Sequence, residues 1–291
     1  MKIAIIGAGS WGKAIYSIIN SGAEKFYITR NSNESEMMKL KSSDLAFLCI
    51  PTSEISAFLD KNYSYLPKNI CSCSKGVLIL SEDGLFLSEY FDKNGFNFAC
   101  LSGPNFASEV LQGIKTITTI ASKHQNLRKE IVQNISGNKF CTEETEHVKA
   151  VEIFGICKNI IALCCGILDG HGVNGQAKKA NFKALILTKL VQEMLRVVQS
   201  SGDDPSAFGL SCGIGDLFLT ATSFESRNYT YGFNFAEHGT INSDGKTVEG
   251  LRSLMAIPIL ESIYKISLPV NKFLYNIFYH GKTVDEFLSI F

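Results

Sequence analysis

Lys158 lies in a stretch where nearly every neighbour is apolar, and the pattern from 154 to 162 predicts a helix. The residues three and four positions away on either side carry no charge: Phe154, Gly155, Ile161 and Ala162. A helix would therefore give Lys158 no local ion-pair partner. Burial lowers the pKa of a lysine, which suits a general acid or base near neutral pH. We predict a catalytic role for Lys158; the alternative is a lysine that reaches solvent from a helix edge.

A second polar cluster follows later in the chain. Asp216 comes directly after Gly213-Ile-Gly215, where it could orient a lysine or bind a hydroxyl. Ser226 could cap a helix start, so that Arg227 and Asn228 add donors at its positive end. This combination suits a phosphate group. The alternative is a capped helix with a solvated arginine.

Three glycines near the N-terminus, Gly7, Gly9 and Gly12, form a G-x-G-x-x-G pattern that also contains Ser10 and Trp11. The pattern follows a predicted strand and opens a predicted helix, which is the context of a dinucleotide-binding turn. The glycines permit a tight turn, backbone approach to a pyrophosphate and close helix packing. An ordinary glycine-rich turn is the alternative.

Arg30 ends the second predicted strand, where NAD-binding proteins place an acidic residue for the ribose hydroxyls. An arginine there can pair with a 2′-phosphate, so NADP is favoured over NAD. A surface arginine without a ligand is the alternative. Three other strand ends combine turn residues with small polar groups: 51–53, 74–76 with Lys75, and 102–105 with Gly103 and Asn105.

The elements that position these residues differ between the two halves. Seven β-rich runs alternate with helical stretches in the first half: 2–6, 26–29, 45–50, 70–74, 98–101, 116–121 and 139–142. This alternation predicts an α/β fold with a parallel, doubly wound sheet of the Rossmann type. The segment 31–43 allows one helix, with Asn33 as N-cap and Glu36 completing a capping box, and no further strand.

The second half predicts an all-α domain, with helices over 148–168, 182–200, 247–266, 270–280 and 284–290. A capping box from Thr283 to Glu286 opens the last of them. The predicted domains are therefore 1–146, which binds the dinucleotide, and 147–291, which is helical and carries substrate-binding and catalytic residues.

Composition excludes several classes of protein. The chain has 291 residues, 28 basic and 28 acidic, and 45% hydrophobic residues. It can bury a core and lacks the basic surface of a nucleic-acid-binding protein. No apolar run approaches the length of a membrane span, so we expect a cytoplasmic protein.

Nine cysteines, mostly in apolar segments, and no cysteine or histidine at metal-ligand spacing argue against a metal site. Buried reduced thiols are the favoured interpretation. Redox-active pairs at Cys71 and Cys73, or at Cys164 and Cys165, are the alternative.

Together the motifs resemble bacterial-type NAD(P)-dependent glycerol-3-phosphate dehydrogenase, in the family's order and from Lys2 to about Arg252. Five segments carry the resemblance: Gly7-Ala-Gly-Ser-Trp-Gly12, Leu101-Ser-Gly-Pro-Asn-Phe-Ala107, Lys158-Asn-Ile-Ile-Ala162 with Asp169-Gly170, Gly215-Asp-Leu217 with Ser226-Arg-Asn228, and Val248-Glu-Gly250.

The resemblance implies oxidation of glycerol 3-phosphate to dihydroxyacetone phosphate, or the reverse, with a product that feeds phospholipid synthesis. Lys158 would be the general acid or base, and Asp216 would orient Lys158 or bind substrate. Lys75 would be a further catalytic residue, beside substrate and cofactor. The other implied substrate contacts are Gly103, Asn105, Ser226, Arg227 and Asn228. The implied cofactor contacts are Ser10, Trp11, Arg30, Lys75, Ala107, Arg227 and Glu249. A homodimer is compatible with this prediction.

The chain departs from the family at four places: a short 31–43 segment, Asn105 for a small hydroxyl residue, Tyr229-Thr230 where basic residues are usual, and a small insertion at 174–180. Ketopantoate reductase or a β-hydroxyacid dehydrogenase, which also use a catalytic lysine, is the nearest alternative. A nucleotide-binding sensor without turnover is another.

Overall fold

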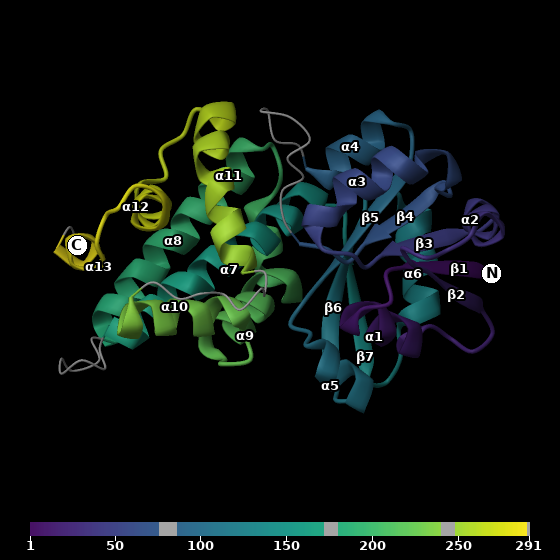
Figure 1. The fold of residues 1–291 in the computed structure, drawn as a ribbon, viewed down its shortest axis with the longest axis horizontal. Helices are drawn as coiled ribbons and strands as arrows, with labels where there is room; N and C mark the ends of the chain where they lie inside the picture. Colours follow the sequence, from purple (N-terminus) through teal and green to yellow (C-terminus); the bar gives the residue numbers. More distant parts are fainter. Residues whose placement is uncertain (76–85, 172–179, 240–247, 290–291) are drawn as a thin grey trace. The chain divides into compact units, whose positions relative to one another are not determined.

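The computed structural model describes residues 1–75, 86–171, 180–239 and 248–289 (Figure 1). They divide into two compact units. The first comprises Met1–Glu152 and Gly209–Cys212, and the second comprises Ile153–Phe208 and Gly213–Phe291. Residues 174–179 of the predicted insertion, and Gly76, lie outside the described residues.

A seven-stranded sheet of order β2-β1-β3-β4-β5-β6-β7 forms the centre of the first unit. Its strands are β1 (Lys2–Ile6), β2 (Glu24–Ile28), β3 (Leu45–Leu48), β4 (Asn69–Ser72), β5 (Asn97–Ser102), β6 (Thr116–Ala121) and β7 (Phe140–Thr145). The helices of this unit are α1 (Ser10–Ile18), α2 (Glu34–Lys41), α3 (Thr52–Asn62), α4 (Leu87–Lys93), α5 (Ala107–Gln112) and α6 (Gln125–Ile135). The predicted doubly wound sheet is confirmed.

The prediction that all strands run parallel is wrong at one pair. β6 pairs with β5 antiparallel, whereas β6 and β7 are parallel to each other. The connection from β5 to β6 holds only α5, a helix of six residues. Such a helix is only about 9 Å long. It is too short to span the length of β5, as a connection between two parallel strands must. The chain reverses instead.

Helices cover both faces of the sheet. Side chains of α1, α5 and α6, such as Ile15, Val110 and Ile131, share one buried core with Ile5 and Phe47 of the strands. Phe98 of β5 points to the opposite face of the sheet from its neighbour Ala99, because side chains alternate along a strand. On that face Phe98 stacks on Phe91 of α4, with 5.3 Å between the ring centroids. Strands covered on both faces are apolar along their whole length, as the fully buried β3 is.

The short segment after β2 forms α2 and no further strand before β3, as predicted. Its capping box is present: the Asn33 side chain accepts from the Glu36 backbone N–H, and the Glu36 carboxylate accepts from the Asn33 N–H. Two reciprocal hydrogen bonds thus start a helix whose own residues bury little apolar surface.

The second unit is helical throughout the residues described. Its helices are α8 (Ala180–Ser200), α9 (Asp216–Thr222), α10 (Arg227–His238), α11 (Glu249–Tyr264), α12 (Pro269–Tyr279), α13 (Val284–Ser289) and most of α7 (Val148–His171). The five predicted helices are present, most with an end shifted by one to three residues; α10 begins at the predicted capped start at Ser226, and α9 was not predicted. The predicted capping box at Thr283 and Glu286 is present.

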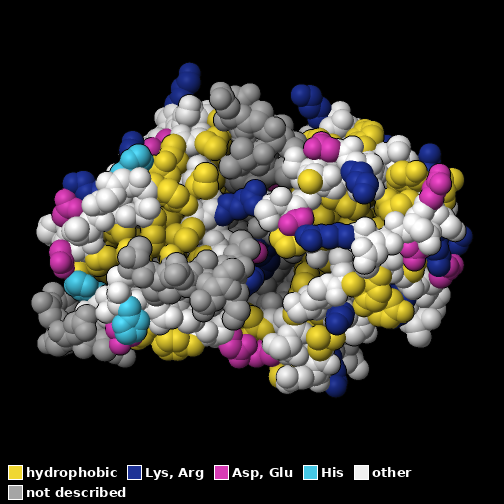
Figure 2. Space-filling view, viewed as in Figure 1, with side chains coloured by type: hydrophobic (Ala, Val, Ile, Leu, Met, Phe, Trp, Pro, Cys, Tyr) yellow, Lys and Arg dark blue, Asp and Glu magenta, His cyan; other side chains and the backbone are white. Residues whose placement is uncertain are grey.

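α7 is the core helix of this unit. By length and composition alone α7 could cross a membrane, although the sequence analysis predicted no apolar run of that length. In the structure, 94% of the most apolar 18-residue stretch of this helix is buried. The core helix of a water-soluble protein passes the same test. Figure 2 shows basic and acidic side chains scattered over one face of the molecule, without a field of one sign.

Glycines let α10 approach α7 closely. A Cβ added at Gly166 would collide with the Tyr229 carbonyl, and one added at Gly232 would collide with the Leu163 carbonyl. The same holds for Gly170 against α10. The backbones of the two helices are therefore in direct contact, which any side chain at these glycines would prevent.

Candidate active site

The glycine-rich turn has the geometry of a dinucleotide-binding turn. Gly7 has φ +103°, and an added Cβ would lie 2.7 Å from the Cys49 carbonyl oxygen. A Cβ at Gly12 would collide with the Gly7 carbonyl. At Gly9, the N-cap of α1, an added Cβ would meet nothing within 4 Å. Two glycines thus serve internal packing, while the third faces open space at a helix N-terminus, where a pyrophosphate fits.

Ser10 and Trp11 are the first residues of α1, directly beside that open space. The structure therefore places both residues where the sequence predicts them, in the turn that would hold the cofactor. Ala107, another predicted cofactor position of this unit, begins α5.

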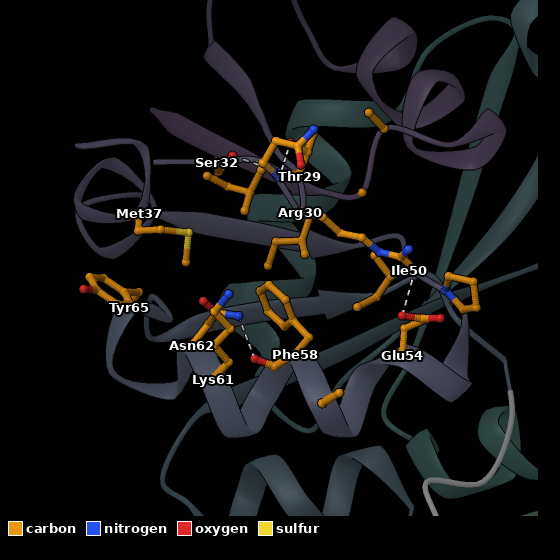
Figure 3. Close-up of a pocket in the computed structure, with 17 residues that line it drawn as sticks. Thr29, Arg30, Ser32, Met37, Ile50, Glu54, Phe58, Lys61, Asn62 and Tyr65 are labelled. Carbon is orange, nitrogen blue, oxygen red and sulfur yellow. Dashed lines mark hydrogen bonds and ion pairs between the residues drawn. The ribbon is translucent and has the colours of Figure 1, made fainter. Parts of the chain in front are cut away.

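A cavity of about 880 Å³ adjoins this turn, within the size range of nucleotide and cofactor sites. It is lined by Gly7 and Ala8, by the residues after β2, and by side chains of α2 and α3. Figure 3 shows Met37 and Tyr65 at one end, Phe58 in the middle and Glu54 at the other end. The short α2 segment therefore still contributes a wall to this pocket.

Arg30 lines the pocket but is already paired. Its guanidinium lies 2.8 Å from the carboxylate of Glu54, and the two side chains are 84% and 44% exposed (Figure 3). Sequence reasoning identified Arg30 and missed Glu54. The available signal was a carboxylate in the first turn of the helix after β3, because ligands of such sheets bind at the carboxyl ends of the strands.

Lys75, Gly103 and Asn105 lie at neighbouring strand ends, as predicted. The Lys75 ammonium donates to the Gly103 carbonyl at 3.4 Å. Asn105 donates to Thr116 Oγ1 at 2.7 Å and to the Ile117 carbonyl at 2.9 Å. Its buried Oδ1 has no hydrogen-bond partner among the described residues. The amide is thus held by β6 and presents one unused acceptor.

Lys158 has a partner that local sequence could not reveal. Its Nζ lies 2.5 Å from Asp216 Oδ1, and the two side chains are only 9% and 2% exposed. Thr220 Oγ1 lies 3.3 Å from the same Nζ and donates to the Asp216 carbonyl at 2.6 Å. Sequence reasoning assigned roles to Lys158 and Asp216 but none to Thr220, although its position four residues after Asp216 puts it on the same helix face.

A π-helical turn, Ser211–Gly215, leads directly into Asp216. A Cβ at Gly213 would collide with the Phe208 carbonyl, which explains the first glycine of the predicted Gly-x-Gly-Asp cluster. Such turns often occur at functional sites because they break the regular helical ladder. Here the turn sets the start of α9 and with it the position of Asp216.

A second network joins two predicted site residues, Asn228 and Glu249, through Asn159. Asn228 donates to Asn159 Oδ1 at 2.9 Å and accepts from the Gly250 N–H at 2.9 Å. Asn159 in turn donates to Glu249 at 3.4 Å. Asn228 therefore has one N–H left for a ligand, and Glu249 is tied to the helix that carries Lys158.

The predicted helix start is present: Ser226 caps α10 by accepting from the Tyr229 N–H at 3.4 Å. Arg227 is exposed and forms no hydrogen bond or ion pair with any residue that the structure describes. The arginine beside the positive end of α10 is thus available to an anion.

Known proteins match the chain over nearly its whole length. The family models for the N-terminus and C-terminus of NAD-dependent glycerol-3-phosphate dehydrogenase match residues 32–128 and 147–289. The glycerol-3-phosphate dehydrogenase [NAD(P)+] of Solidesulfovibrio magneticus is 31% identical, over 97% of this chain and 95% of the relative. The chain belongs to the NAD(P)-dependent glycerol-3-phosphate dehydrogenase family. It is an oxidoreductase that uses NAD(P).

Solved structures show the same fold. The crystal structure of glycerol-3-phosphate dehydrogenase from Coxiella burnetii has a TM-score of 0.84 at 22% identity, covering 99% of this chain and 97% of that one. A ketopantoate reductase from Ralstonia eutropha has a TM-score of 0.60 at 15% identity, covering 99% of each chain. The predicted family is thus confirmed, and the predicted rival is a more distant member of the same architecture.

Proposed function

We propose that the chain interconverts sn-glycerol 3-phosphate and dihydroxyacetone phosphate, with NADP preferred over NAD. The observation that carries the proposal is the buried pair of Lys158 and Asp216 in the unit that also holds the capped start of α10. We further propose a cytoplasmic homodimer whose product supplies phospholipid synthesis, as the family resemblance implies.

Lys158 moves the proton. In the reducing direction its ammonium donates a proton to the C2 oxygen, and in the oxidising direction the neutral amine takes that proton. Asp216 and Thr220 hold Nζ in place, so the lysine needs no reorientation during turnover. When bound, the nicotinamide supplies or accepts the hydride.

The substrate phosphate would bind at the start of α10. Ser226 already accepts from the backbone, so Arg227 and the remaining N–H of Asn228 supply the side-chain donors. Lys75, Gly103 and Asn105 are the further substrate contacts that the family resemblance implies. A phosphate remote from the reacting carbon orients C2 by binding energy that the chemistry does not consume.

The cofactor would lie on Gly7, Gly9, Ser10, Trp11 and Gly12, with Arg30 at a 2′-phosphate. Lys75, Ala107, Arg227 and Glu249 are the further contacts that the resemblance implies. The glycine-rich turn fits a dinucleotide because it is open at Gly9 and because Gly7 and Ala8 line the cavity.

The test is the loss of reduced-nicotinamide absorbance with dihydroxyacetone phosphate, comparing NADPH with NADH and using ketopantoate as a control substrate. We expect turnover with the triose phosphate alone, and faster turnover with NADPH. Turnover with ketopantoate instead would overturn the substrate assignment. Cofactor binding without turnover on any substrate would support a sensor.

Lys158→Ala should abolish turnover and leave cofactor binding intact. Lys183→Ala is the matched control, because Lys183 pairs with Asp169 at the same distance of 2.5 Å in the same unit but is 27% exposed. Near-normal activity of Lys158→Ala would contradict the mechanism.

A further inference from the structure

Three cysteines lie together beneath the glycine-rich turn. Cys49 follows β3, Cys71 belongs to β4, and Cys73 follows β4. Leu48 is paired with Ser72, and the Cys73 N–H donates to the Leu48 carbonyl at 2.9 Å. The next pair in register is therefore Cys49 and Cys73. Neighbouring strands lie about 4.8 Å apart, within the roughly 4.4–6.8 Å between Cα atoms that a disulfide requires.

The three cysteine side chains share one packed region with Trp11. Cys71 and Cys73, two residues apart, point to the same face of the sheet. Both belong to the core on which Trp11 and Cys49 pack. A thiol cluster thus lies under the turn that would hold the pyrophosphate.

Within the cluster, Cys73 is the reactive thiol, and Cys49 is the second thiol that can form a disulfide with it. Burial raises the pKa of Cys73, but the neighbouring polar side chains of Cys49, Cys71 and Trp11 and the charge of Lys75 outweigh burial and hold this pKa well below its usual range. Burial raises the pKa of Cys49 and Cys71. The thiolate is the nucleophilic form of cysteine. Cys73 is 7% exposed and Cys49 is only partly buried, so a small oxidant can approach from the side of Cys49.

We propose that Cys49 and Cys73 form an oxidation site, at which a hydroperoxide converts the two thiols into an intramolecular disulfide. The Cys73 thiolate attacks one peroxide oxygen; the O–O bond breaks, and the departing hydroxide takes up a proton to become water. The Cys49 sulfur then attacks the resulting sulfenic acid; the S–O bond breaks, and a second water leaves with the Cys49 proton. Two thiols lose two electrons, and one hydrogen peroxide becomes two waters.

Oxidation would act on the dinucleotide turn. The Cys49 carbonyl lies against Gly7, where an added Cβ would be 2.7 Å away. The strand ends beyond the two cysteines are also tied together, by Ser74 to the Ile50 carbonyl and by Thr52 to the Lys75 carbonyl. A disulfide draws the two sulfurs to about 2.05 Å and removes the thiol that Trp11 contacts. We therefore expect weaker cofactor binding, a consequence that rests on the proposed function.

The experiment treats the full chain with hydrogen peroxide, blocks remaining thiols by alkylation and maps disulfides by mass spectrometry. We expect a linked Cys49–Cys73 peptide pair that dithiothreitol reverses. Trp11 is the only tryptophan in the chain. Its fluorescence should fall on oxidation and recover on reduction, because a disulfide quenches a neighbouring indole. The dissociation constant for NADPH should rise on the order of tenfold, equivalent to about 1.4 kcal/mol.

Cys49→Val and Cys73→Ala should each abolish the linkage, with folding checked by thermal melting. Cys141→Ser is the matched control, since Cys141 is partly buried on β7 and should leave the linkage unchanged. Oxidation of Cys141 without a Cys49–Cys73 link would overturn the proposal, and so would over-oxidation of Cys73 to a sulfinic acid. The mapping requires no cofactor, so its failure is distinct from failure of the proposed function.

Discussion

Two ion pairs, one in each unit, differ mainly in their exposure to water. Lys158 and Asp216 lie 2.5 Å apart with 9% and 2% of their side chains exposed. Arg30 and Glu54 lie 2.8 Å apart with 84% and 44% exposed. The distances are similar, but water screens only the second pair.

The difference separates two kinds of task. An exposed pair contributes about 0–1 kcal/mol, so Arg30 can leave Glu54 for a ligand phosphate at little cost. Breaking a buried pair by removing one partner costs about 3–5 kcal/mol, so Lys158 stays where Asp216 holds it. The exposed charge can therefore select among cofactors, while the buried charge holds a fixed position for chemistry.

The largest expected effect is that of Asp216→Ala, which removes the carboxylate that the buried Lys158 ammonium contacts at 2.5 Å. We expect the free energy of unfolding to fall by about 3–5 kcal/mol in denaturant titrations. The double variant Lys158→Met/Asp216→Leu should recover most of that loss, and neither variant should turn over. A single variant as stable as the double one would show that the pair is not buried as described.

Glu152 extends the comparison to a buried carboxylate that forms no ion pair with any residue the structure describes. It accepts from the Ser88 N–H at 3.1 Å and the Ser88 hydroxyl at 2.5 Å, while neighbouring Glu89 is paired with Lys149. Burial, with a smaller contribution from Glu89, raises the pKa of Glu152 to about 7 against the hydrogen bonds. The pKa of Glu152 is higher in the folded than in the unfolded chain. Its contribution to the free energy of unfolding is therefore fully present below pH 4.5 and is lost as the pH rises to about 7.

Glu152→Gln should flatten that pH dependence. Between about pH 4.5 and 7 the wild type should lose up to about 3 kcal/mol of unfolding free energy relative to the variant. Denaturant titrations across this range make the measurement, with the exposed Glu24→Gln as control. Parallel stability curves for wild type and Glu152→Gln would contradict the assignment.

A smaller effect is expected for Asn228→Ala, which removes an uncharged link. The Gly250 N–H and Asn159 Oδ1 would each lose a buried partner, costing about 1–3 kcal/mol in thermal or denaturant unfolding. Asn94→Ala, which removes one exposed hydrogen bond, should change stability much less. Equal losses for the two variants would place Asn228 outside a buried network.

The smallest effect on stability, less than about 1 kcal/mol, is expected for Glu54→Gln. The variant should instead lower the KM for NADPH severalfold and leave the KM for NADH nearly unchanged, because Arg30 is released to a 2′-phosphate. Arg30→Ala should do the opposite for NADPH. Glu24→Gln, in the comparable surface pair with Lys39, is the control and should change neither KM. If the ratio of the KM for NADPH to the KM for NADH is unchanged in Glu54→Gln, Arg30 does not select the cofactor.

Local features of the fold could be predicted from sequence because their causes are local. β1 and β6 lie at their predicted bounds, since apolar β-formers and turn residues delimit them. The capping boxes at Asn33 and Thr283 need only residues three positions apart. The antiparallel direction of β6 depends on the short connection through α5, and the composition of the strand itself does not encode that direction.

The site was predictable in its residues and less so in its contacts. Burial of Lys158 follows from its neighbours, but its pairing with Asp216 joins residues 58 positions apart. Thr220 and Glu54 carry no motif of their own, and each matters only through the charged group it faces. Asn228 was predicted as a phosphate ligand, and its internal hydrogen bonds depend on Asn159 and Gly250 from two other helices.

The contact of α7 with α10 has a consequence for how the chain can vary. At Gly166, Gly170 and Gly232 even a methyl group collides with the backbone of the facing helix. In a saturation library every replacement at these positions should be depleted, although none of them contacts substrate or cofactor in the proposed mechanism. A map of intolerant positions would thus mark this helix crossing as strongly as Lys158, and intolerance alone would not distinguish a packing constraint from a chemical one.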